Sequence, residues 1–231
     1  MTDTEKQPDY LGHRQRLRTR FLLNEGKDMA DYELLELVLT MAIPRRDVKP
    51  LAKVLIRRYT SFADVINAPS QELLAVDGIK ENTLAMLKVI RAAASRVSWQ
   101  RLQASDQPII CRYDQLVDYC RAEMTFSDVE ELRLIYLDTK LRVIGQEVAA
   151  KGTINSVAVH PREVAKAAML RNAASVIMVH NHPSGDVTPS KADVEMTRQI
   201  KASLATVGIK LNEHLIISKF NEYSFNNSGT I

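Results

Sequence analysis

The hydrophobic pattern changes near residue 105, and this change limits the folds that the chain can adopt. Before it, apolar residues recur at helical spacing in ADYELLELVLTMAI, PLAKVLIRRY, SQELLAV and NTLAMLKVIRAAASRV. After Pro108, short segments rich in Val, Ile and Leu, such as ELRLIYLD, SVIMVH and HLIISKF, are separated by helical stretches. The sequence therefore predicts an α+β protein, in which an all-α module, residues 1–105, precedes an α/β domain, residues 106–231.

The composition is that of a globular protein with enough apolar material for a hydrophobic core. Of the 231 residues, 45% are hydrophobic, and no apolar run reaches the roughly 18 residues that a membrane span requires. The N-terminus, MTDTEKQPDYLGHRQR, is too polar and too acidic for a secretory signal or a transit peptide. We therefore expect a cytoplasmic protein that does not interact with membranes. Because Cys111 and Cys120 form no CxxC pair, we expect neither a disulfide framework nor a cysteine-based zinc site.

The basic charge is concentrated in the N-terminal module, which makes DNA a candidate partner. Residues 1–105 contain 17 Lys and Arg against 13 Asp and Glu, whereas residues 106–231 contain 14 against 15. The segment LLAVDGIKENTLAMLKVIRAA has the pattern of a helix-hairpin-helix, whose turn brings backbone N–H groups close to phosphate in DNA-binding proteins. Lys80 stands where such turns usually have a second glycine. The alternative is therefore an αα-hairpin used only for packing or protein contact.

A pair of histidines follows the apolar run SVIMVH and suggests a metal site. Side chains at positions i and i+2 of a strand lie on one face, so His180 and His182 can point toward one position while Asn181 faces away. The turn-rich segment PSGDVTPS follows, and a helix is expected to begin at Ser190, with Asp193 in its first turn. If the loop folds back, three ligands form with a fourth position left to water, as in catalytic zinc sites.

The same segment can also be explained without a metal. Ser190 and Asp193 have the spacing of a capping box, with serine at the N-cap and an acid three residues later. The cap does not account for two histidines at a spacing of two in a chain that has only five histidines. The residues by themselves therefore leave both interpretations open.

Longer stretches of the sequence resemble a known family. The spacing H-x-H-x10-D, with proline after the second histidine, resembles the JAMM (MPN+) metalloprotease motif of deubiquitinating isopeptidases. The segment HPREVAKAAMLRNAASVIMVHNHPSGDVTPSKADVEMTRQIKASLATVGIKLNEHLII is similar to the bacterial RadC family, as is GHRQRLRTRF…DYELLELVL…IPRRDVKPLAK. The likeness covers nearly the whole chain. It implies a JAMM/MPN-like, cytidine-deaminase-like metal-binding fold for residues 106–231 and a helix-hairpin-helix-like fold for residues 1–105.

The resemblance also implies a ligand set and a reaction. In this family pattern His180, His182 and Asp193 bind Zn2+, and Ser190 lies near the metal-bound water, where its hydroxyl can stabilise an oxyanion. The implied function is that of a zinc-dependent hydrolase, a metallopeptidase or isopeptidase that acts on a protein or peptide substrate. Zinc in such a site lowers the pKa of its water to about 7 and so supplies hydroxide at neutral pH.

JAMM enzymes further use an upstream glutamate as general base, on or before an early strand. Glu130 and Glu131 both precede LRLIYLD in this chain. We favour Glu130, because it matches the glutamate that precedes this strand in RadC-like sequences. A glutamate pair at a solvated strand entrance is the alternative without catalysis.

Two other functions are compatible with the resemblance. The RadC name is linked to DNA repair, so the first is a DNA-associated protein whose metal domain is regulatory or cleaves a phosphodiester. The second is a metal-free scaffold, which the intact ligand set disfavours. The sequence departs from the family at Asn212-Glu213-His214, where the usual pattern is LDH. This departure concerns the surroundings of the predicted ligands and leaves the ligands themselves unchanged.

Overall fold

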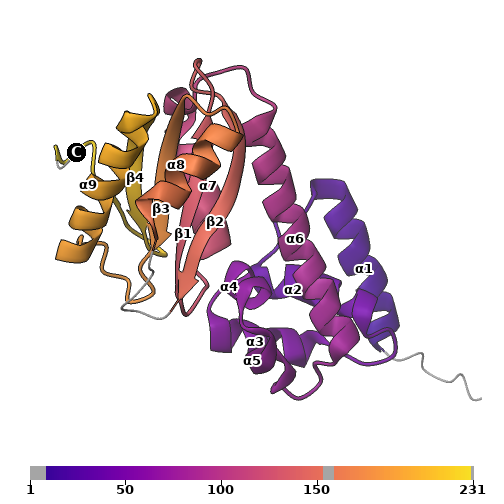
Figure 1. Ribbon diagram of the computed structural model, residues 1–231. Coiled ribbons are helices and arrows are strands. Elements are labelled where there is room, and N and C mark those ends of the chain that lie inside the picture. The colour runs from indigo at the N-terminus through magenta and orange to yellow at the C-terminus, as the bar shows by residue number, and fades with distance from the viewer. Residues whose placement is uncertain (1–8, 153–158, 230–231) are drawn as a thin grey trace, which may run out of the picture. The chain divides into compact units, whose positions relative to one another are not determined.

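The computed structural model describes residues 9–152 and 159–229, and the chain forms two compact units, Met1–Ala94 and Ser95–Ile231 (Figure 1). The described part of the first unit is helical, and the second contains a sheet with helices, as the change of sequence pattern predicts. The division lies inside the helix Glu81–Gln103, earlier in the chain than the boundary expected after residue 105. The physical reason is that Trp99 and Leu102, late in that helix, pack into the hydrophobic core of the second unit.

The helical unit is built around apolar side chains that become buried where short helices meet. Leu35, Leu55, Leu73 and Leu87 are each fully buried in one cluster. Ser61 begins one of the short helices by accepting a hydrogen bond from the backbone N–H of Asp64, at 3.0 Å. No helix in the described parts of the chain is both long and apolar enough to span a bilayer. The helices are α1 (Asp9–Asn24), α2 (Asp31–Ala42), α3 (Lys49–Tyr59), α4 (Phe62–Asn67), α5 (Ser70–Leu74) and α6 (Glu81–Gln103).

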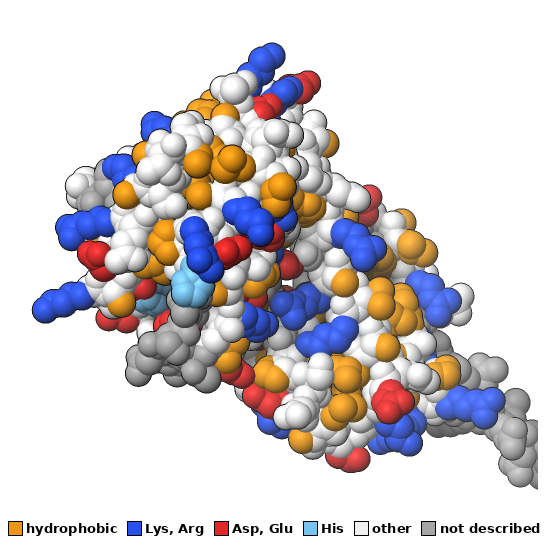
Figure 2. Space-filling view, viewed as in Figure 1, with side chains coloured by type: hydrophobic (Ala, Val, Ile, Leu, Met, Phe, Trp, Pro, Cys, Tyr) orange, Lys and Arg blue, Asp and Glu red, His pale blue; other side chains and the backbone are white. Residues whose placement is uncertain are grey.

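The predicted helical hairpin is present as α5, a tight turn and the start of α6. Gly78 has a φ of +91°, a conformation that favours glycine, and Ile79 is buried behind it. Lys80 is exposed at the beginning of α6. On the face of the molecule seen in Figure 2, Lys and Arg side chains lie among acidic and apolar ones. Contact between this hairpin and DNA stays a prediction.

The hairpin prediction has a direct test in the full chain. If Lys80 contacts phosphate, Lys80→Glu should weaken duplex binding several-fold and reduce the dependence of log K on log salt by about 1. Fluorescence anisotropy of a labelled duplex across a salt titration measures both quantities. Lys140→Glu changes an exposed lysine of the second unit and serves as the control. Equal binding by both variants would exclude a contact between Lys80 and DNA. If the unmodified chain does not bind the duplex even at low salt, the hairpin does not contact DNA.

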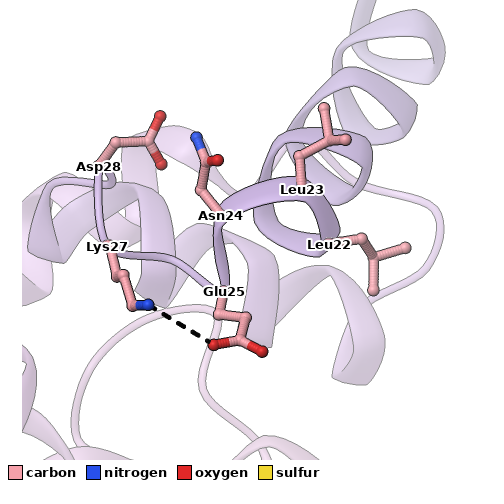
Figure 3. Close-up of a pocket in the computed structure, with 6 residues that line it drawn as sticks. All are labelled: Leu22, Leu23, Asn24, Glu25, Lys27 and Asp28. Carbon is pink, nitrogen blue, oxygen red and sulfur yellow. Dashed lines mark ion pairs between the residues drawn. The ribbon is translucent and has the colours of Figure 1, made fainter.

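An open hollow of about 630 Å³ lies at the end of α1 (Figure 3). Leu22 and Leu23 are exposed there, and Lys27 Nζ lies 3.9 Å from a carboxylate oxygen of Glu25. The residues that line this hollow include no histidine or cysteine, and its lysine is the one that lies near Glu25. We therefore assign no chemistry to it.

The second unit contains a five-stranded mixed sheet with the strand order β2-β1-β3-β4-β5. β1 is antiparallel to both β2 and β3, β3 is parallel to β4, and β4 is antiparallel to β5. The strands are β1 (Glu130–Leu137), β2 (Val143–Gly152), β3 (Ser175–Asn181), β4 (Lys210–Ile217) and β5 (Glu222–Ser224). The helices are η1 (Ile109–Arg112), α7 (Tyr113–Met124), α8 (Pro161–Leu170) and α9 (Lys191–Thr206).

Helices cover both faces of this sheet, so β1 and β3 are buried on both sides (Figure 1). Alternate residues of each strand belong to different cores. Leu134 and Met178 pack with α8 and α9, whereas Ile135 and Ile177 pack with α7. Because β1 runs antiparallel to β3, the beginning of β1 and the end of β3 meet at the same edge of the sheet.

Candidate metal centre

Three predicted ligands converge where β3 ends and α9 begins. His180 Nε2 lies 2.9 Å from His182 Nε2 and 3.4 Å from Asp193 Oδ1, and His182 Nε2 lies 3.7 Å from Asp193 Oδ2. One ligand atom from each residue lies within 4.8 Å of the others. A tetrahedral ion with bonds of about 2.1 Å separates its ligands by roughly 3.4 Å. The spacing and the donor types therefore fit a zinc ion.

The strand and the loop after it explain how the two histidines meet. His180 is the last even-numbered residue of β3 and faces the α9 side, as Met178 does. His182 follows the strand, and its backbone N–H still donates to Ile217 O of β4 at 2.9 Å. The chain then turns at Gly185, whose φ is +87°. The turn places Asp186 O 2.6 Å from His182 Nδ1.

That contact determines the tautomer of His182. A backbone carbonyl only accepts hydrogen bonds, so Nδ1 of His182 carries the proton and donates it to Asp186 O. In the neutral ring Nε2 then presents its lone pair toward His180 and Asp193. A metal ligand oriented through its other nitrogen is the usual arrangement of histidine in metal sites.

The capping box and the ligand cluster coexist and use the same carboxylate. Ser190 Oγ accepts a hydrogen bond from Asp193 N at 3.1 Å and donates to Asp193 Oδ2 at 2.6 Å. The backbone N–H of Ser190 also donates to Oδ2, at 2.7 Å. Oδ2 is thus held by the cap, whereas Oδ1 lies toward His180. The two explanations of this segment are not exclusive, because the cap orients Asp193.

The two candidate glutamates lie on opposite faces of β1. Leu132 pairs with His180, and Glu130, two residues earlier, lies on the same face. Burial raises the pKa of Glu130; the neighbouring His182 opposes this increase, and Asp193 adds a smaller one. Glu131 is buried on the other face, where it accepts a hydrogen bond from Arg133 Nη2 at 2.7 Å. Only Glu130 therefore shares the electrostatic environment of the three predicted ligands.

Asn181, between the histidines, fastens the start of β1 to the end of β3. Its side chain accepts a hydrogen bond from the backbone N–H of Glu131 at 2.8 Å and donates to Val129 O at 3.1 Å. These bonds bracket Glu130 from both sides along the chain. Alternation predicts that Asn181 faces away from His180 and His182, but its contact with β1 depends on strand pairing and was not predicted.

His214 lies beside the predicted ligands, although no local sequence pattern places it there. Its Nε2 lies 2.8 Å from His180 Nδ1, and its Nδ1 lies 2.6 Å from Thr197 Oγ1 of α9.

Burial lowers the pKa of His180 to about 4, an effect that the Asp193 carboxylate opposes and His182 strengthens. Burial also lowers the pKa of His214 well below its ordinary value, and both nearby histidines add to the shift. Both rings are therefore neutral at pH 7.

The buried neutral histidines predict an acid-sensitive metal-free protein. His180 has a pKa of about 4 in the folded chain and an ordinary value of 6.5. Between these values the unfolded chain binds more protons, so the free energy of unfolding falls as the pH is lowered. From pH 7 to pH 5, His180 should account for about 2 kcal/mol. Urea unfolding with chelator present measures this loss.

Two substitutions make the pH experiment specific. His180→Asn should make the dependence of unfolding free energy on pH shallower, because one of the two buried titrating rings is removed. His160→Asn changes an exposed histidine and should leave the dependence as in the unmodified protein. If the unfolding free energy depends on pH in the same way in all three proteins, His180 is not the buried neutral ring inferred here.

Comparison with known proteins identifies the family. Residues 110–230 match the model of the RadC-like JAB domain. The chain is 44% identical over 223 residues to a UPF0758 protein of Ruegeria pomeroyi, covering 96% of this chain and 99% of the relative. It is 43% identical over 215 residues to a UPF0758 protein of Rhodobacter capsulatus, covering 93% of this chain and 100% of the relative. The JAB/MPN superfamily includes hydrolases, and its domains often bind zinc. The resemblance seen in the sequence is thereby confirmed, and the chain belongs to the RadC family.

Proposed function

We propose that this protein is a zinc-dependent hydrolase of amide bonds, a metallopeptidase or isopeptidase acting on proteins or peptides. The observation that carries the proposal is the convergence of His180, His182 and Asp193 beside Glu130, on one face of the sheet. The JAB domain supports it, because the JAB/MPN superfamily includes hydrolases.

The donor set favours zinc over harder cations. Two imidazole nitrogens and one carboxylate suit zinc, whereas magnesium and calcium take mainly oxygen ligands. Three protein ligands leave one coordination position for water, as in hydrolytic zinc sites. When bound, zinc would supply a Lewis acid and lower the pKa of a coordinated water to about 7.

Glu130 has the position and the electrostatics of a general base. Its carboxyl is half-buried, and its raised pKa brings proton uptake closer to neutral pH than in an exposed glutamate. Glu130 accepts a proton from the attacking water and returns it to the leaving amine. Asn181 supports this role by holding the chain on both sides of Glu130.

Ser190 serves two purposes in this mechanism. In the structure its hydroxyl donates to Asp193 Oδ2, which also accepts from the backbone N–H of Ser190. Rotation of the hydroxyl toward substrate would leave that backbone bond in place, so Asp193 would keep its orientation. The freed hydroxyl then donates to the developing oxyanion, a contribution that can reach several kcal/mol in hydrolases.

A peptide-library cleavage assay with a chelator control tests the proposed function. We expect cleavage by the zinc-loaded full chain, loss of cleavage after chelation, and recovery when zinc is added back. Mass spectrometry of the products identifies the bond that is cut. Cleavage that survives chelation, or a zinc-loaded protein that cuts DNA and no peptide bond, would contradict the proposal.

A further inference from the structure

A row of hydrogen bonds leads from the candidate metal centre into the protein interior. It begins at His180 Nδ1, which lies 2.8 Å from His214 Nε2, and continues from His214 Nδ1 to Thr197 Oγ1 at 2.6 Å. Thr197 Oγ1 in turn lies 2.5 Å from the backbone carbonyl oxygen of Asp193. His214 and Thr197 are completely buried, so water does not compete for these bonds.

The far end of the row determines which atom donates at each step. A carbonyl oxygen only accepts, so the hydroxyl of Thr197 donates to Asp193 O. The Thr197 oxygen is then free to accept from His214 Nδ1–H, which leaves a lone pair on His214 Nε2. That lone pair accepts from His180 Nδ1–H. His180 Nε2 consequently presents its own lone pair toward His182 and Asp193.

The position of His214 depends on an irregularity in β4. Val176 of β3 pairs with Leu211, but Ile177 pairs with Glu213, so the register skips Asn212. Such a bulge moves the following side chains to the opposite face of the sheet. It is the reason that His214, opposite Met178, lies on the side of His180 and α9.

The C-terminal segment holds His214 from its other side. The ring of Phe225 stacks on that of His214, with centroids 4.4 Å apart, and Phe225 N donates to His214 O at 3.0 Å. The carboxylate of Glu213 accepts from Ser224 Oγ at 2.7 Å and from Asn226 N at 3.1 Å, on either side of Phe225. The glutamate in the Asn212-Glu213-His214 stretch therefore fastens the segment that packs against His214.

We propose that His214 is a positioning residue that prepares His180 for metal binding. Among the described residues it supplies the acceptor that keeps the proton of His180 on Nδ1 and the ring in its orientation. The inference rests on the proposed zinc site. Loss of an outer hydrogen-bond partner of a metal-ligating histidine typically weakens metal affinity by ~10–100-fold.

Two substitutions at position 214 separate hydrogen bonding from packing. His214→Phe keeps an aromatic ring against Phe225 but removes the acceptor, so its affinity for zinc should be ~10–100-fold weaker than that of the unmodified chain. His214→Gln places a carbonyl oxygen near the position of Nε2 and should stay within a few-fold of the unmodified chain. Competition with a chromophoric chelator at pH 7.5 measures zinc affinity in the full-length proteins.

The unfolding free energy of the metal-free proteins provides the second readout. If His214 acts only through packing, both variants should lose stability, while their zinc affinities should equal that of the unmodified chain. If His214→Phe does not fold, Thr197→Val removes the acceptor of His214 Nδ1–H and should weaken zinc binding several-fold. That loss is expected because His214 can then carry its proton on Nε2, where it no longer accepts from His180.

The outcomes distinguish this inference from the proposed function. If the unmodified chain does not bind zinc, both are wrong. If it binds zinc and the variants lacking the acceptor bind equally tightly, only the role of His214 is wrong. Weaker binding by His214→Phe, restored by His214→Gln, supports both.

Discussion

Replacing Glu130 with Gln is expected to abolish hydrolysis while the protein keeps its zinc. Gln has nearly the same shape but does not accept the proton of the attacking water, and a general base typically contributes ~10²–10⁴-fold to the rate. Glu130 is not among the three converging ligands, so metal content should stay unchanged. Turnover of an identified peptide substrate and elemental analysis of the same preparation measure the two effects.

Glu131→Gln is the matched control, because it makes the same chemical change one residue away. Glu131 is paired with Arg133 in a buried position, at 2.7 Å, and also lies 3.7 Å from Lys151. Arg133 also lies 3.5 Å from a carboxylate oxygen of Glu123, so the loss of stability should be smaller than the roughly 3–5 kcal/mol of a completely broken buried pair. This variant should therefore melt at a lower temperature while its folded fraction keeps normal turnover. The opposite pattern, with turnover lost only in Glu131→Gln, would assign the base to Glu131.

The second large effect is expected from His182→Ala, which should leave the purified protein without zinc. The substitution removes one of three ligands, so the affinity should fall by more than the ~10–100-fold associated with an outer partner. His182 lies at the end of β3 and outside both hydrophobic clusters of the sheet, so the fold should persist. Elemental analysis after dialysis, together with far-UV circular dichroism, measures the metal and the fold.

Asp186→Asn is the control for the loop that carries His182. The interaction with His182 Nδ1 comes from the backbone carbonyl of Asp186, which the substitution leaves in place. The side chain of Asp186 is exposed and accepts hydrogen bonds from Thr188, including one from its backbone N–H at 2.9 Å. Full zinc occupancy is therefore expected for Asp186→Asn. Stoichiometric zinc in His182→Ala would exclude His182 as a ligand.

Local patterns predicted several of the helices and strands and indicated that three side chains could converge. Alternation along an extended chain puts His180 and His182 on one side, and the Ser190-to-Asp193 spacing signals a helix start. Both signals depend on residues close in the chain. The unit boundary was less predictable, because the polar stretch after residue 97 continues α6 as far as Gln103.

Relations between distant segments required the tertiary structure. The choice between Glu130 and Glu131 depends on which face of β1 turns toward the end of β3, and the sequence shows only that the two alternate. Strand register and pairing are set by the packing of whole elements, so a single residue reveals neither.

By itself the sequence determined that a helical module precedes an α/β domain, that the chain belongs with RadC proteins, and that two histidines and an aspartate can meet. Only the tertiary structure showed that Glu130 lies on the same face of β1 as Leu132, which pairs with His180, and that His214, 34 residues beyond His180, lies within hydrogen-bond distance of it. The reason is physical. Periodicity is a property of the local backbone, whereas the bulge at Asn212 that turns His214 toward α9 exists only in the assembled sheet.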